Sequence, residues 1–177
     1  MNNECLSKKE TFSRENMIKG RIAEALIEEL FLALGYGVFR YGMENTVPCV
    51  TKLLSGVSGE VANNIRKMPD FVIQHPEKKD VYFIEVKFRS SGEFNKNDRC
   101  FTQNNKSFLD YPYKNVYFIV VSKRYIKCIT YEELMEGKTI TSTSQNWLGK
   151  KKEFELDKDK DVIIKFCDFA VKFFENV

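Results

Sequence analysis

The chain has 177 residues, of which 43% are hydrophobic and 14% aromatic, so it can bury the core of one domain and is not expected to be disordered. Its formal net charge is only +3, so attraction to nucleic acid would depend on where positive charges gather rather than on their sum. No apolar run approaches the roughly 18 residues of a membrane span. The five cysteines form no Cys-x-x-Cys pair and there is one histidine, which argues against a zinc site or a disulfide framework. We expect a single cytoplasmic domain with no membrane partner.

The first predicted element is a helix over residues 13–34. Apolar residues recur there at helical spacing, and Gly35 follows as the expected residue just past a helix end. Glu24 borders the apolar arc of this helix, whereas Glu28 lies a step further toward solvent. Gly20, one turn before Glu24, leaves room for a neighbouring chain or a substrate. Glu24 is therefore the helix carboxylate expected to reach a site, although a solvated charge at Glu24 explains the helix alone equally well.

Three strands are predicted next, over 36–41, 70–74 and 81–89. The last two are separated by the turn-forming segment 75–80, and so short a connection predicts an antiparallel hairpin. His75 begins this turn, where a solvated side chain is expected. A turn centred on its middle residues sets Asp70 opposite Glu85.

Opposed carboxylates are a chemical signal because their charges repel unless a metal, a proton or a cation lies between them. Directly opposed residues have Cβ atoms about 4.5–5.5 Å apart, so Asp70 and Glu85 could share one hard cation such as Mg²⁺. Lys87 leaves the same face of the strand as Glu85 and could orient or deprotonate a metal-bound water. An ordinary amphipathic strand explains Glu85 and Lys87 by themselves. The coupling to Asp70 favours a site for phosphodiester hydrolysis.

The rest of the chain completes an α/β pattern. Further elements are predicted as a short helix near 102–110, strands over 115–122 and 126–130, and helices over 131–136 and 161–176. The order is α-β-β-β-α-β, a mixed sheet flanked by helices, with a core over 13–122 and a C-terminal extension over 123–177 that adds a strand and helices. The aromatic stripe of the last helix predicts packing on the sheet or, alternatively, a homodimer interface. The insertion over 43–68 could be a lid or a DNA-contacting helix.

Three motifs in this order resemble the PD-(D/E)xK nuclease superfamily, whose fold is restriction-endonuclease-like. They are Gly20-x-x-x-Glu24, Pro69-Asp70 and Glu85-Val86-Lys87. The resemblance covers about 19–122 and implies the α-β-β-β-α-β core. Residues 19–20 and 38–40 are also similar to the opening of archaeal Holliday-junction resolvases.

The resemblance assigns a role to each motif residue. It implies that Asp70 and Glu85 bind Mg²⁺ together with the backbone carbonyl of Val86, and that Mn²⁺ substitutes for Mg²⁺. It implies that Lys87 assists the attacking water and that Glu24 ligates the metal directly or through water. Cleavage would leave a 5′-phosphate.

Basic residues gather near these motifs in the sequence and are predicted to contact phosphates independently of base sequence. They are Arg66, Lys67, Arg89, Lys96, Arg99, Lys123 and Arg124. Together these features predict a Mg²⁺-dependent DNA endonuclease. Two alternatives stay open: a non-catalytic nucleic-acid-binding module or subunit that keeps the fold, and a Holliday-junction resolvase, which would need a two-fold dimer.

Overall fold

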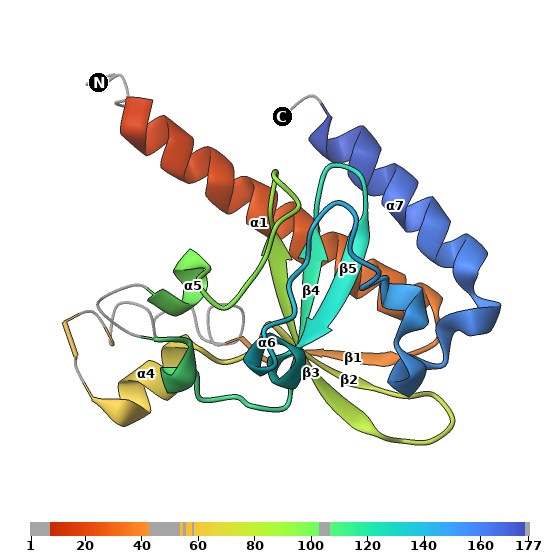
Figure 1. Ribbon diagram of the computed structural model, residues 1–177, viewed down its shortest axis with the longest axis horizontal. Coiled ribbons are helices and arrows are strands. Elements are labelled where there is room, and N and C mark those ends of the chain that lie inside the picture. Colours follow the sequence, from red (N-terminus) through yellow and green to blue (C-terminus); the bar gives the residue numbers. More distant parts are fainter. Residues whose placement is uncertain (1–7, 43–53, 55, 58, 103–106, 176–177) are drawn as a thin grey trace, which may run out of the picture.

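The computed structural model describes residues 8–42, 54, 56–57, 59–102 and 107–175, and over these residues the chain is an α/β protein built on a five-stranded mixed sheet (Figure 1). The strands are β1 (Gly37–Arg40), β2 (Phe71–Gln74), β3 (Val81–Phe88), β4 (Val116–Val121) and β5 (Ile126–Thr130). The helices are α1 (Lys8–Ala33), α4 (Glu60–Arg66), α5 (Arg99–Thr102), α6 (Tyr131–Met135) and α7 (Lys160–Phe174). Short 3₁₀ turns span Phe108–Asp110, Leu148–Lys150, Lys152–Phe154 and Leu156–Lys158.

The five described strands lie in the sheet in chain order, and among them only β3 and β4 are parallel. The β2–β3 hairpin has the predicted register, because Phe71 pairs with Ile84 and Gln74 pairs with Val81. Asp70 immediately precedes β2, so continuing the register sets it opposite Glu85. The predicted α/β class, with a mixed sheet and flanking helices, is confirmed.

The expectation of a solvated His75 was wrong. Its side chain is buried at 4% exposure, and its Nδ1 accepts hydrogen bonds from the backbone N–H groups of Glu77 and Lys78 at 3.2 Å each. Its ring packs edge-on against Tyr36 with 5.3 Å between the centroids. The imidazole thus satisfies two donors of the hairpin turn while it covers an aromatic side chain of the core.

The two faces of the sheet are covered by different parts of the chain. Ile84 and Val86 pack with α1 and α7, and Figure 1 shows α1 behind the strands and α6 in front of them. The other face carries Phe118 and Val120, which lie in register with Glu85 and Lys87. Aromatic residues of the crossover between β3 and β4 cover that face, namely Phe94, Phe101, Phe108 and Tyr111. Glu85 and Lys87 therefore face an aromatic layer.

This crossover differs from its prediction. Parallel neighbours need a connection of a dozen or more residues, commonly helical. The short helix expected near 102–110 is replaced by α5, which ends at Thr102, and by the 3₁₀ turn Phe108–Asp110, while 103–106 lie outside the described residues. Edge-to-face aromatic contacts hold the crossover to the sheet, with 5.3 Å between the ring centroids of Phe101 and Phe118.

The ends of the chain follow the predictions with shifted boundaries. α1 begins at Lys8 rather than near residue 13, and α7 and β5 lie where they were expected. α6 is fixed by a capping box, in which Thr130 and Glu133 exchange side-chain to backbone hydrogen bonds of 2.9 and 3.1 Å. Much of the 43–68 insertion, 43–53 together with 55 and 58, lies outside the described residues, and α4 forms its last part. Among the helices that are described, none is both long and apolar enough to cross a lipid bilayer.

One lysine is fully buried in the C-terminal part of the chain. Lys127 on β5 has 0% exposure, and its ammonium is enclosed by backbone carbonyls and aromatic rings. It donates to the carbonyl oxygens of Thr141 (2.6 Å), Ser142 (3.1 Å) and Ser144 (2.8 Å) and lies 4.2 and 4.6 Å from the ring centroids of Tyr125 and Trp147. Burial lowers its pKa. Three acceptors and two π faces compensate for the lost hydration, so the ammonium holds the 141–147 loop against the sheet.

Candidate metal centre

The site begins where the β2–β3 ladder ends. Continuing the register past β2 sets Pro69 opposite Val86, and proline has no N–H to donate to the ladder. The backbone N–H of Val86 is satisfied by a side chain, because Asp70 Oδ2 accepts a 2.7 Å hydrogen bond from it. The N–H and C=O of one strand residue point toward the same neighbouring strand. The Val86 carbonyl is therefore directed to the side on which Asp70 lies, at the position where Pro69 offers no donor.

Glu85 is a buried carboxylate in an unusual environment. Its side chain is 9% exposed, and Lys87 Nζ donates a hydrogen bond to its Oε1. Its Oε2 is buried and has no hydrogen-bond partner among the described residues. Burial, followed by the negative charge of Asp70, raises the pKa of Glu85 to about 8, although Lys87 acts in the opposite direction. One ammonium offsets only part of the charge of two carboxylates.

Lys87 keeps its positive charge in this site. Burial lowers its pKa, but the charges of Glu85 and Asp70 outweigh burial and hold the pKa above its ordinary value. Lys87 therefore acts here as a fixed cation and a hydrogen-bond donor.

These donors fit a hard divalent cation. The Glu85 Oε2 atom, the Asp70 carboxylate and the Val86 carbonyl are all oxygen ligands, which Mg²⁺ prefers. Across the described ranges no group of three or more His, Cys, Asp and Glu side chains is placed to hold a metal. Mg²⁺ commonly binds through one or two carboxylates while retaining several waters.

The two helix glutamates differ in their partners. Glu28 is hydrogen-bonded to Arg40, with 2.9 Å between Oε1 and the guanidinium Nε. Glu24 lies close enough to Glu85 for its charge to contribute to the raised pKa of Glu85. Both glutamates are half-buried, so exposure does not separate them. The helix carboxylate that acts electrostatically on the site is Glu24.

Two of the predicted phosphate-binding arginines have protein partners. Arg89 forms a bidentate ion pair with Asp98, with 2.7 Å between Arg89 Nε and Asp98 Oδ2. Arg66 donates to the backbone carbonyl oxygens of Leu54 and, at 2.6 Å, of Val57. Arg89 thus ties the start of the crossover to the end of β3, and Arg66 links the end of α4 to Leu54 and Val57.

The other predicted basic residues vary in exposure. Lys67 has a buried ammonium that lies 5.5 Å from the ring centroid of Tyr111. Lys96, Arg99 and Arg124 are exposed, and Lys123 is half-buried. The Lys67 ammonium thus lies over the ring of an aromatic residue of the crossover.

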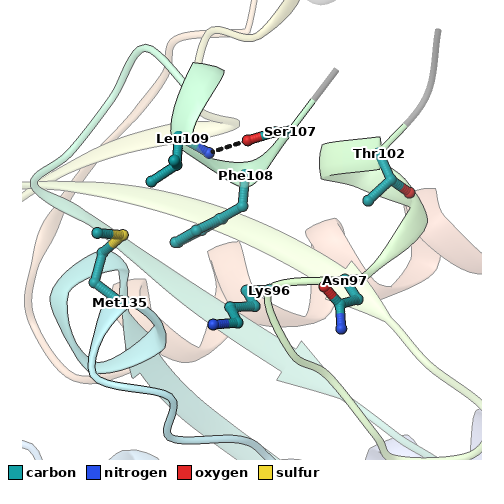
Figure 2. Close-up of a pocket in the computed structure, with 7 residues that line it drawn as sticks. All are labelled: Lys96, Asn97, Thr102, Ser107, Phe108, Leu109 and Met135. Carbon is teal, nitrogen blue, oxygen red and sulfur yellow. Dashed lines mark hydrogen bonds between the residues drawn. The ribbon is translucent and has the colours of Figure 1, made fainter. Parts of the chain in front are cut away.

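A separate hollow of about 360 Å³ lies beside the crossover (Figure 2). Its lining residues are Lys96, Asn97, Thr102, Ser107, Phe108, Leu109 and Met135. Figure 2 shows these side chains, which come from the segment just before α5, from α5, from the 3₁₀ turn with its N-cap Ser107, and from α6. Asp70, Glu85 and Lys87 do not line this hollow, so it is distinct from the carboxylate site.

Reasoning from the sequence missed Tyr111. Its side chain is 4% exposed, and its hydroxyl has no hydrogen-bond partner in the described part of the chain. Burial and then the charge of Glu85 raise its pKa, so the hydroxyl stays protonated beside the carboxylates. A tyrosine before a proline in a loop carries no sequence signal for such a position, because the crossover fold alone brings it there.

We compared the chain with protein-family models, with curated proteins and with solved structures, and none of these comparisons found a match. What the site does is therefore inferred from its own residues.

Proposed function

We propose that this chain is a Mg²⁺-dependent endonuclease of the PD-(D/E)xK type that hydrolyses phosphodiester bonds of DNA in the cytoplasm. The observation that carries the proposal is the buried Glu85 carboxylate next to Asp70, with Lys87 on one oxygen and no hydrogen-bond partner for the other among the described residues. A carboxylate pair in this state suits a divalent cation. The parallel β3–β4 pair beside antiparallel β1–β3 is compatible with a restriction-endonuclease-like core.

Each residue has a proposed role. Asp70, Glu85 and the Val86 carbonyl would hold Mg²⁺, with Glu24 acting through water. When bound, Mg²⁺ supplies charge neutralisation at phosphoryl oxygens and lowers the pKa of a water. Lys87 would orient the attacking water by donating a hydrogen bond, since its ammonium already lies on Glu85 Oε1.

The direct test is incubation of the purified protein with supercoiled, linear, single-stranded and four-way-junction DNA, in Mg²⁺, Mn²⁺ or EDTA. We expect nicked and linearised plasmid with 5′-phosphate ends in either metal, and no cleavage in EDTA. Selective cutting of the junction would identify a resolvase instead. DNA binding without cleavage of any substrate would identify a non-catalytic nucleic-acid-binding module.

Lys87→Ala should lose turnover while keeping the metal. The variant retains both carboxylates and removes a positive charge beside them, so Mn²⁺ affinity should hold or rise, while kcat falls about 10²-fold or more. Titration calorimetry with Mn²⁺ and single-turnover cleavage measure the two effects.

Lys96→Ala is the matched control, because Lys96 is exposed and borders the separate hollow. It should change only DNA affinity and its salt dependence. Equal losses of turnover in the two variants would mean that Lys87 acts only as a phosphate contact.

A further inference from the structure

Tyr111 lies on the same face of the sheet as the carboxylate site. Its ring packs against Phe118 with 5.5 Å between centroids, and Phe118 on β4 is the register partner of Glu85 on β3. Side chains of paired residues on neighbouring strands leave the same face, with the strands about 4.8 Å apart. Tyr111 therefore sits over the strand position next to Glu85.

Two buried polar atoms near this position have no hydrogen-bond partner within the described ranges. They are the Tyr111 hydroxyl and Glu85 Oε2, in side chains that are 4% and 9% exposed. The Tyr111 ring packs on Phe118, the register partner of Glu85, yet the Tyr111 hydroxyl donates to neither Glu85 nor Asp70. Buried polar groups are nearly always hydrogen-bonded in folded proteins. Two buried polar atoms that lack partners on the same face of the sheet suit a polar ligand that pairs with both.

We propose that Tyr111 is a substrate-contacting residue of this site, whose hydroxyl donates a hydrogen bond to a phosphate oxygen held beside Glu85. The assignment rests on the proposed function, since it takes a phosphate group as the ligand. Lys67 supports the assignment, because its ammonium lies 5.5 Å from the Tyr111 ring centroid and adds positive charge beside this tyrosine. An anionic oxygen is the ligand that a protonated hydroxyl and an ammonium both stabilise.

Tyr111→Phe tests the proposal because it removes the hydroxyl and keeps the ring contacts with Phe101 and Phe118. A buried hydroxyl without a partner does not stabilise the fold, so the variant should melt at or above the wild-type temperature in EDTA. Its Mn²⁺ affinity should stay within about twofold, while kcat/KM for DNA cleavage should fall about tenfold or more. Lower activity with undiminished stability is a combination that a purely structural tyrosine would not give.

Tyr113→Phe is the matched control. Tyr113 belongs to the same segment, its ring lies 6.3 Å from that of Tyr111 between centroids, and its hydroxyl donates to the Asn64 carbonyl at 3.4 Å. We expect wild-type cleavage from this variant. Comparison of the pair separates loss of the Tyr111 hydroxyl from a general disturbance of the aromatic layer.

Calorimetric titration with inorganic phosphate in the presence of Mg²⁺ gives a readout that needs no catalysis. The wild type should bind phosphate, and Tyr111→Phe should bind it about fivefold or more weakly. If the wild type cuts no DNA but this difference is seen, the nuclease proposal fails and the role of Tyr111 stands. If the wild type cuts DNA and Tyr111→Phe cleaves and binds phosphate equally well, or melts several degrees lower, the role of Tyr111 is overturned and the nuclease proposal stands.

Discussion

Glu85→Gln should abolish DNA cleavage while it stabilises the protein in EDTA. Glutamine keeps the size of the side chain and an acceptor for Lys87, but it lacks the anionic oxygen that would bind the metal. We expect cleavage to fall about 10³-fold or more, because the metal carries much of the charge stabilisation in phosphodiester hydrolysis. DNA binding in EDTA should change little, since phosphate contacts come from other residues.

The size of the stability effect depends on pH. The pKa of Glu85 is raised from 4.5 to about 8, so between these values the folded state holds a proton that the unfolded state releases. Wild-type stability therefore falls as pH rises through this interval, and the penalty is absent below pH 4.5. Glu85→Gln lacks the titrating group, so its advantage should grow with pH to the order of a few kcal/mol near pH 8. Urea unfolding in EDTA at pH 5, 6.5 and 8 measures it.

Two further variants make this result specific. Asp70→Asn should also lose cleavage, while its side-chain oxygen can still accept the Val86 N–H that closes the ladder. Glu29→Gln changes an exposed glutamate of α1 and should leave activity and stability as in the wild type. Full activity in Glu85→Gln, or a pH dependence of its stability that matches the wild type, would contradict the metal centre.

Lys127→Met should cause a large loss of stability. Methionine fits the volume of the lysine chain but leaves the carbonyl oxygens of Thr141, Ser142 and Ser144 without their shared donor. Leaving buried acceptors unpaired costs about 1–3 kcal/mol each, and partial relaxation of the loop suggests a total of about 3–5 kcal/mol. The midpoint of thermal unfolding should fall by about 6–20 °C for a chain of this size.

Lys152→Met provides the comparison for Lys127→Met, because Lys152 is exposed and its removal should shift the midpoint by about 1 °C or less. Circular dichroism melts of both variants measure the difference. Equal midpoints would mean that the 141–147 loop rearranges freely and that the ammonium does not hold it.

The sequence alone determined those parts of the protein that depend on neighbours in the chain. Helical spacing identified α1 and α7, and the short turn at 75–80 set the β2–β3 register that brings Asp70 opposite Glu85. Turn length and strand alternation are local properties, so they can be predicted without knowledge of the rest of the fold. The candidate carboxylate pair could therefore be predicted, together with the basic residue Lys87 beside it.

Only the tertiary structure decided what surrounds these residues. The crossover covers the face of Glu85 and places Tyr111 there, Asp98 takes Arg89 into an ion pair, and Lys127 is enclosed by a distant loop. Lysine and arginine have the same sequence pattern whether they are solvated, paired or buried, because burial depends on contacts between segments far apart in the chain. The same contacts set the pKa of Glu85, since its burial arises from segments that only the folded chain brings together.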